Sequence, residues 1–184
     1  MFKRTTTTIN IDTGETKELE SYFSYWNDEK GYLFKSRARS LNFSDEEFPS
    51  GFSFIEKGML FELMHYIYKD SNILSKRTKH GIRPLNTKDM LKILGLEKSQ
   101  VYKLINKLIE HSILARVKIE VGSKTEIQYW LNPFYFLSGK YVSPTLYFVF
   151  RDSLKNLVPD YIRDKFEEQD VTVRNINGKK VNER

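Results

Sequence analysis

The feature that most constrains the fold of this chain is a pair of short helical patterns on either side of Gly95. Thr87 is a good N-cap, and Met90, Leu91 and Leu94 form a short apolar face behind it. Gly95 then stands where a helix ends in the left-handed conformation, which glycine adopts without strain. The sequence therefore predicts a short helix that ends at this glycine.

The second helical pattern begins near Lys98 and is apolar on one side only. Its apolar residues recur at helical spacing and form a single stripe of Val101, Leu104, Ile105, Leu108 and Ile109. The opposite side and its flanks carry hydrogen-bonding and cationic side chains without a carboxylate, namely Ser99, Gln100, Tyr102, Lys103, Asn106 and Lys107. Such a face suits the major groove of DNA, where Lys pairs with guanine acceptors and Asn or Gln with adenine. Two helices joined in this way predict a helix-turn-helix.

Two alternating stretches follow this helix pair. Residues 113–120 and 125–131 alternate apolar and polar side chains, and residues 121–124 form a turn between them. A helix-turn-helix followed by a hairpin predicts an α+β protein with a winged-helix core. The tip of the wing, formed by Gly122, Ser123 and Lys124, is expected to contact the DNA backbone or the minor groove.

The first seventy residues predict strands followed by a helix. Residues 5–11 alternate β-branched side chains, and a glycine turn at 12–15 leads to another extended stretch, which predicts a hairpin. A third strand is expected within the aromatic-rich segment 22–34. Ser53 and Glu56 fit a capping box, and apolar residues at helical spacing predict a helix over 54–70: Ile55, Met59, Leu60, Leu63, Met64 and Ile67.

The rest of the chain completes the predicted organisation. Residues 71–84 are expected to be a basic connector with a short helical turn near 72–74. Asn132 and Pro133 are expected to start a short helix that Gly139 ends, and a further helix is expected to start at Pro159. We therefore divide the chain into a strand-rich extension (1–50), the winged-helix domain (53–140), a C-terminal helical segment (141–168) and a mobile polar tail (169–184).

Positive charge is concentrated in the same region as the helix pair. The chain carries a net charge of +6, but residues 76–124 hold twelve Lys or Arg against four acids, which gives +8 for this stretch and −2 for the remainder. Concentrated positive charge attracts polyanions such as nucleic acid, although a basic solvated face is the simpler alternative.

These patterns assign roles to individual residues. The side chains expected to face bases are Ser99, Gln100, Lys103 and Asn106. Those expected at or near phosphates are Thr87, Lys88, Lys98, Tyr102, Lys107 and Lys124. Glu97 departs from the usual pattern, since it occupies the cap of the second helix, where Ser or Thr is common and where a carboxylate would repel a nearby phosphate.

Little in the sequence points to catalysis or to a bound cofactor. The chain has no Cys, its three histidines share no metal-binding spacing, and it has no Walker-type glycine loop, Gly-x-Ser-x-Gly elbow or dinucleotide fingerprint. Its eleven tyrosines leave a nicking tyrosine open by residue type, but the His-hydrophobic-His metal motif of such nicking enzymes is absent. We expect no enzyme activity, no cofactor and no metal. The lack of a long apolar run and of a signal-peptide pattern predicts a cytoplasmic protein without membrane contact.

Directly behind the predicted winged helix, the sequence has a strand, Asn132-Pro133, a run of aromatics and Gly139-Lys140. This order of features resembles the RepL-type replication initiation proteins of Firmicute plasmids. The early Thr13-Gly14-Glu15 turn also fits their N-terminal region. The resemblance spans roughly residues 5–150 and depends mostly on 81–140. It implies a winged-helix protein that recognises double-stranded DNA at a replication origin.

Other functions remain open at this point. A transcriptional repressor of the MarR-like winged-helix kind would need the same groove contacts, and a winged-helix module that binds an acidic protein partner would need no DNA. A DNA site with two-fold symmetry would require a homodimer, with recognition helices about 34–36 Å apart.

Overall fold

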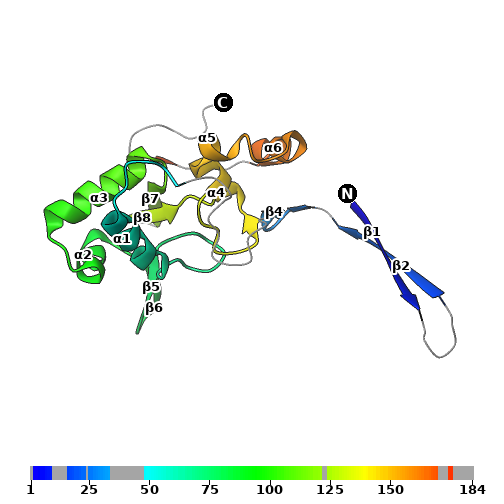
Figure 1. Ribbon diagram of the computed structural model, residues 1–184, viewed down its shortest axis with the longest axis horizontal. Helices are drawn as coiled ribbons and strands as arrows, with labels where there is room; N and C mark the ends of the chain where they lie inside the picture. The colour runs from blue at the N-terminus through cyan, green and yellow to red at the C-terminus, as the bar shows by residue number, and fades with distance from the viewer. Residues whose placement is uncertain are drawn as a thin grey trace.

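The structure, a computed structural model, describes residues 2–9, 16–23, 25–33, 48–121, 124–169 and 174–175. It contains both helices and sheets, in agreement with the predicted α+β class. The first two strands, β1 (Phe2–Ile9) and β2 (Thr16–Phe23), pair antiparallel and confirm the predicted hairpin, while its turn lies outside the described residues. This hairpin lies at the opposite end of the molecule from α2 (Thr87–Leu94) and α3 (Lys98–Glu110) (Figure 1).

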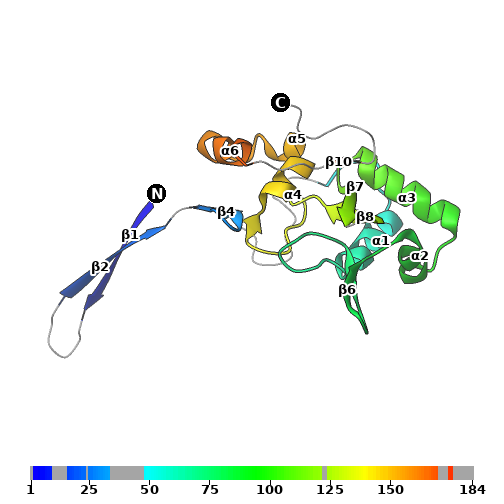
Figure 2. The same cartoon turned by 180° about the vertical axis from the view of Figure 1, so that it is seen from behind.

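The centre of the fold is the hairpin of β7 (Leu114–Val121) and β8 (Lys124–Leu131). Successive strand residues point to opposite faces of a sheet, and here both faces are covered. On one face, Leu114, Tyr129 and Leu131 pack against buried residues of α1 (Phe54–Met64), α2 and α3. On the other face, Ala115, Val117 and Trp130 pack against the C-terminal helices. The hairpin therefore forms the middle layer of a helix–sheet–helix arrangement (Figures 1 and 2).

Helix α1 begins as predicted and ends earlier. The Ser53 hydroxyl accepts a hydrogen bond from the Glu56 N–H at 3.2 Å, and the Glu56 carboxylate accepts one from the Ser53 N–H at 2.8 Å, which confirms the capping box. The helix ends at Met64 rather than at residue 70, because the chain turns back and pairs Ile67 with Leu74. Ile55, expected in the apolar stripe, is 70% exposed.

The helix pair around Gly95 forms as expected, with one correction at its start. The N-cap of α2 is Asn86, whose side chain accepts from the Asp89 N–H at 3.0 Å, and Thr87 is the first residue inside the helix. Gly95 adopts φ +62° and ends α2, as predicted. Helix α3 starts at Lys98, and its apolar stripe is buried at Val101, Leu104, Ile105 and Leu108.

The connector 71–84 differs from the prediction. Instead of a helical turn, Ile73 and Leu74 lie along β8, and Ile73 forms an antiparallel bridge with Trp130. The chain then forms a hairpin of β5 (Ser75–Thr78) and β6 (Gly81–Pro84). Gly81 follows the turn with φ +113°. The pairing partner of residues 72–74 is more than fifty positions away in sequence, so no local pattern reveals it.

The helix expected after Asn132 is reduced to one turn. The Tyr135 and Phe136 N–H groups both donate to the Asn132 carbonyl, at 3.1 and 3.0 Å, and the turn goes no further. Phe136 is buried in the core around α1 to α3, whereas Leu137 is buried in the core around the C-terminal helices. Consecutive side chains of this segment thus enter two separate cores, and the backbone of Phe136 and Leu137 is not helical.

A small sheet and three helices complete the fold. The sheet has the strand order β3 (Trp26–Asn27), β4 (Gly31–Leu33) and β9 (Tyr141–Val142), so the segment 22–34 contributes two strands rather than one. The helices are α4 (Pro144–Val149), α5 (Arg151–Leu154) and α6 (Asp160–Glu167), the last starting after Pro159 as predicted. Ile162 and Phe166 of α6 are fully buried against the same chain. Within the predicted tail, β10 (Arg174–Asn175) pairs with β7 (Figure 2).

Candidate nucleic-acid interface

The outward face of α3 is exposed and polar along its length. The exposed residues are those that the helical spacing places away from the core: Lys98, Ser99, Gln100, Tyr102, Lys103 and Asn106. Tyr102 is the only aromatic among them, with 38% of its surface exposed, and the Lys98 ammonium lies 5.8 Å from its ring centre. No carboxylate occurs between Lys98 and Ile109, so an approaching polyanion meets like charge only at the two ends of this face, at the exposed Glu97 and Glu110.

Lys107 has a different environment from the one predicted. Its ammonium donates to Glu56 Oε1 at 2.7 Å and to the Gly51 carbonyl at 2.7 Å, and it lies 4.6 Å from the Phe52 ring centre. The hydrogen bond from Lys107 holds the pKa of Glu56 below its ordinary value. Lys107 therefore ties α3 to the start of α1, and its charge is already matched by Glu56.

Arg116 joins the hairpin to the face of α3. Its Nη2 donates to Asn106 Oδ1 at 3.4 Å, and its guanidinium lies 5.8 Å from the Tyr129 ring centre. Lys118 is exposed and, two residues further along β7, lies on the same face of the strand. Both cations were absent from the predicted site. The alternation of Ala115, Val117 and Ile119 with Arg116 and Lys118 could have revealed them, since the apolar residues fix which side of the strand is buried.

The start of α2 supplies a second group of predicted contacts. Lys88 is exposed in the first turn, and the Thr87 hydroxyl lies 3.2 Å from the Tyr129 hydroxyl. Backbone N–H groups and the helix dipole make a helix N-terminus favourable for an anion such as phosphate. Thr87 is held next to β8 and is only partly exposed, so Lys88 is the more accessible of the two.

Asp89 forms ion pairs with two of the twelve cations in the basic stretch. Arg83 donates to both of its carboxylate oxygens, at 2.7 and 2.9 Å, and Lys76 forms a further ion pair with it. Burial of Asp89 would raise its pKa, but the hydrogen bonds from Arg83, Lys76 and the Asn86 N–H outweigh burial and hold the pKa well below the usual carboxyl range. The exposed basic residues of the stretch are Arg77, Lys79, Lys88, Lys92, Lys98, Lys103 and Lys118.

The predicted wing tip is not placed by the structure. Gly122 and Ser123 lie outside the described residues, and of Lys124 only the backbone is described, as the first residue of β8. Strands β7 and β8 remain paired as far as Val121 and Lys124, which are the last described residues on the two sides of the tip.

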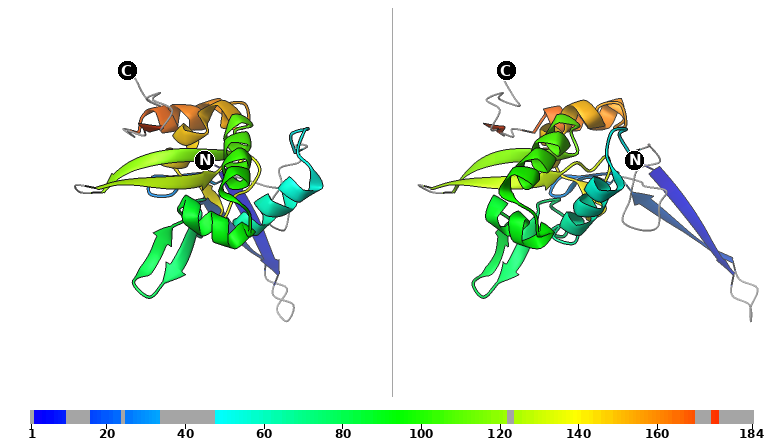
Figure 3. Two further views of the ribbon diagram at one scale, coloured as in Figure 1. Left: turned by 90° about the vertical axis from the view of Figure 1, so that its left-hand side faces the viewer. Right: turned by 60° about the vertical axis from the view of Figure 1, so that its left-hand side comes forward.

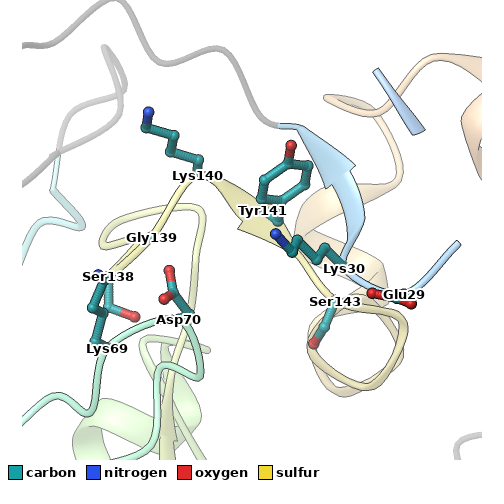
Figure 4. A pocket seen from close by; sticks show the side chains of 9 residues that line it. All are labelled: Glu29, Lys30, Lys69, Asp70, Ser138, Gly139, Lys140, Tyr141 and Ser143. Carbon is teal, nitrogen blue, oxygen red and sulfur yellow. The ribbon is translucent and has the colours of Figure 1, made fainter. Parts of the chain in front are cut away.

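A cavity with a volume of about 640 Å³ lies away from this face. It lies between the β3–β4 turn, the chain that leads into β9 and the loop after α1 (Figure 4). Three lysines and two acids line it: Lys30, Lys69, Lys140, Glu29 and Asp70. The Lys140 ammonium points away from Asp70 (Figure 4). These charges nearly balance, so the cavity has no clear preference for an anion or a cation.

The described residues contain neither a metal site nor a helix that could span a membrane. Within the described ranges, no group of three His, Asp or Glu side chains is arranged to hold a metal ion. Among the helices that the structure describes, none is long and apolar enough to cross a membrane. No family model, no curated protein sequence and no solved structure matches the chain.

Proposed function

We propose that this chain is a sequence-specific double-stranded DNA-binding protein with a winged-helix core, acting as a plasmid-type replication initiator or as a phage or plasmid regulator. In this proposal α2 and α3 form the helix-turn-helix, β7–β8 forms the wing, and α3 enters the major groove. Ser99, Gln100, Lys103 and Asn106 face the bases, while Lys88 and Lys118 contact phosphates.

One observation carries the proposal. Between Lys98 and Ile109 the exposed side of α3 has hydrogen-bonding and cationic groups and no acid, with exposed Glu97 and Glu110 only at its two ends, while its buried side is packed against the core. Lys103 lies in the middle of this exposed side, and no ion pair joins it to another side chain of the described region. Base edges in the major groove offer the acceptors and donors that such side chains complement. The exposed cations Lys88, Lys98 and Lys118 extend the same positive surface to neighbouring elements.

The experiment is fluorescence anisotropy on labelled duplex fragments that tile the gene for this chain and its flanks, at two salt concentrations with competitor DNA. We expect one fragment to bind tightly in the presence of competitor. Lys103→Glu should abolish this binding without changing the melting temperature, because the residue is exposed. Lys155→Glu, at the C-cap of α5, makes the same charge change at another exposed lysine and serves as the control. Equal binding by both variants would refute the assignment of α3.

The position in the gene of the fragment that binds tightly distinguishes a replication initiator from a transcriptional repressor. An initiator should bind repeats inside or near its own gene and support replication of a plasmid that carries them. A transcriptional repressor of the MarR-like kind should bind its own promoter instead. Both roles use the same groove contacts, so only the location of the site and the replication assay distinguish them.

A protein-interaction module is the alternative from a different class, and one observation favours it. Helix α1 exposes large apolar side chains near its start, with Phe54 92% and Ile55 70% exposed. Apolar docking depends weakly on salt, whereas binding to B-DNA loses affinity with a log–log slope of about −0.9 per neutralised phosphate. Uniform weak DNA binding that disappears in salt would favour this alternative.

A further inference from the structure

The β5–β6 hairpin projects on the same side of the molecule as the β7–β8 hairpin. Strand β8 runs inward from the turn of its hairpin, and residues 72–74 lie antiparallel beside it through the Ile73–Trp130 bridge. The chain therefore runs through residues 72–74 toward the end of the β7–β8 hairpin that carries its turn. From there it continues into β5. Both views in Figure 3 show the two hairpins extending from the same side of α2 and α3.

The base of this hairpin is fixed to the start of α2. Lys76 of β5 and Arg83 of β6 are opposite each other in the hairpin, and both bind Asp89 in the first turn of α2. A bidentate contact from Arg83 restricts rotation as well as distance. The hairpin is therefore held in a defined position beside Lys88, a proposed phosphate contact.

The outer part of the hairpin is basic and exposed. Arg77, Lys79 and His80 are exposed, and Ile82, opposite Arg77, is 47% exposed. No ion pair joins Arg77 or Lys79 to an acid in the part of the chain that the structure describes. Four paired residues in each strand place the tip about 13 Å from the base of the hairpin, at about 3.3 Å per residue. This length corresponds to about four base pairs of B-DNA.

We propose that the β5–β6 hairpin is a second DNA-contacting arm, in which Arg77 and Lys79 bind the phosphate backbone beyond the stretch read by α3. This inference rests on the proposed function. Phosphate contacts carry no sequence information, so the arm adds affinity and fixes the register of α3 on the duplex. The arm lies on one side of the helix pair, so it extends the protected DNA in one direction only.

The test compares Arg77→Ala/Lys79→Ala with a control that removes two exposed charges elsewhere, Lys155→Ala/Lys165→Ala, at the C-cap of α5 and on α6. Anisotropy on a labelled 30-base-pair duplex of arbitrary sequence, measured across a salt series, gives the log–log slope. Hydroxyl-radical footprinting on the tight fragment gives the protected length. Thermal melting of both variants verifies that they are folded.

The arm variant should have a salt slope smaller by about 1.8, since two phosphates are no longer neutralised. Its footprint should shorten by about four base pairs on one side, while the control keeps the wild-type slope and footprint. If the arm variant has the salt slope and footprint of the control, the β5–β6 hairpin does not contact DNA. In that case, loss of binding by Lys103→Glu would still support the role of α3. A wild-type chain that binds no duplex would overturn both.

Discussion

The Lys107 ammonium of α3 lies 2.7 Å from the Glu56 carboxylate of α1, and the same carboxylate closes the capping box with Ser53. One carboxylate thus stabilises the start of α1 and fixes α3 against it. Because of this contact, two lysines four residues apart on the same helix, Lys103 and Lys107, have different environments. Lys103 is exposed and forms no ion pair within the described part of the chain, whereas Lys107 joins α3 to the start of α1.

Lys107→Ala should lower stability and leave DNA contacts largely intact. It removes an ion pair whose two side chains are mostly buried and a hydrogen bond to the Gly51 carbonyl, which together contribute about 1–2 kcal/mol. The melting temperature should fall by about 2–8 °C. Lys103→Ala should show the reverse, with unchanged melting and roughly tenfold weaker duplex binding. Melting curves and anisotropy on the two variants check this, and a larger binding loss at Lys107 would contradict it.

Arg116→Ala should weaken binding through Asn106. The guanidinium holds the Asn106 amide oxygen at 3.4 Å, so its removal frees the amide to rotate and lowers discrimination at the base that Asn106 reads. A double-mutant cycle with Asn106→Ala should give a coupling of about 0.5–1 kcal/mol in duplex binding. Additive losses in the two single variants would show that the residues act independently.

Asp89→Asn should make stability less dependent on pH. The pKa of Asp89 is lowered in the folded chain from its ordinary value of 3.8, so its ionised form stabilises the fold fully above that value. As the pH falls below 3.8 the unfolded chain takes up the proton first, and about 1 kcal/mol of this stabilisation is lost by pH 3. Urea unfolding at pH 7, 5 and 3 should show a wild-type advantage that is constant from pH 7 to 5 and smaller at pH 3. An advantage independent of pH would contradict the ion cluster.

Glu97→Ser should strengthen DNA binding. Glu97 is exposed at the N-cap of α3, where its charge would repel a phosphate, and Ser caps a helix equally well. Removal of the like charge should improve duplex affinity by about three- to tenfold at low salt, with little change in melting temperature. Anisotropy at two salt concentrations measures it, and weaker binding would place Glu97 in contact with a base instead.

Asn72→Ala should be strongly destabilising. The Asn72 side chain is fully buried, donates to the Leu131 carbonyl at 2.9 Å and accepts from the Ser138 N–H at 2.8 Å. Its backbone is left-handed, with φ +58°, which Asn tolerates better than Ala does. The loss of buried hydrogen bonds should cost about 2–4 kcal/mol in the free energy of unfolding, measured in urea. Asn72→Gly retains the backbone conformation and shows how much of the cost is due to the side chain.

The sequence alone determined the elements whose signals are local. Helix α3 followed from five apolar residues at helical spacing, and the end of α2 followed from Gly95, which adopts the expected left-handed conformation. The hairpin β7–β8 followed from alternation, because each strand has one buried residue for every outward one. The exposed residues of the predicted α3 face, Lys107 excepted, also followed from this periodicity.

Only the tertiary structure decided the features that depend on distant partners. The β5–β6 hairpin has little apolar alternation, and its position depends on Asp89 of α2, so the sequence of 71–84 gives no sign of it. The same holds for Lys107, whose role depends on a carboxylate 51 positions earlier, and for Arg116, which meets α3 only after β7 has packed. Periodicity shows which side of an element is buried, because burial follows the spacing of apolar residues. It does not show which charged group of another element lies opposite, because that depends on how the chain as a whole packs.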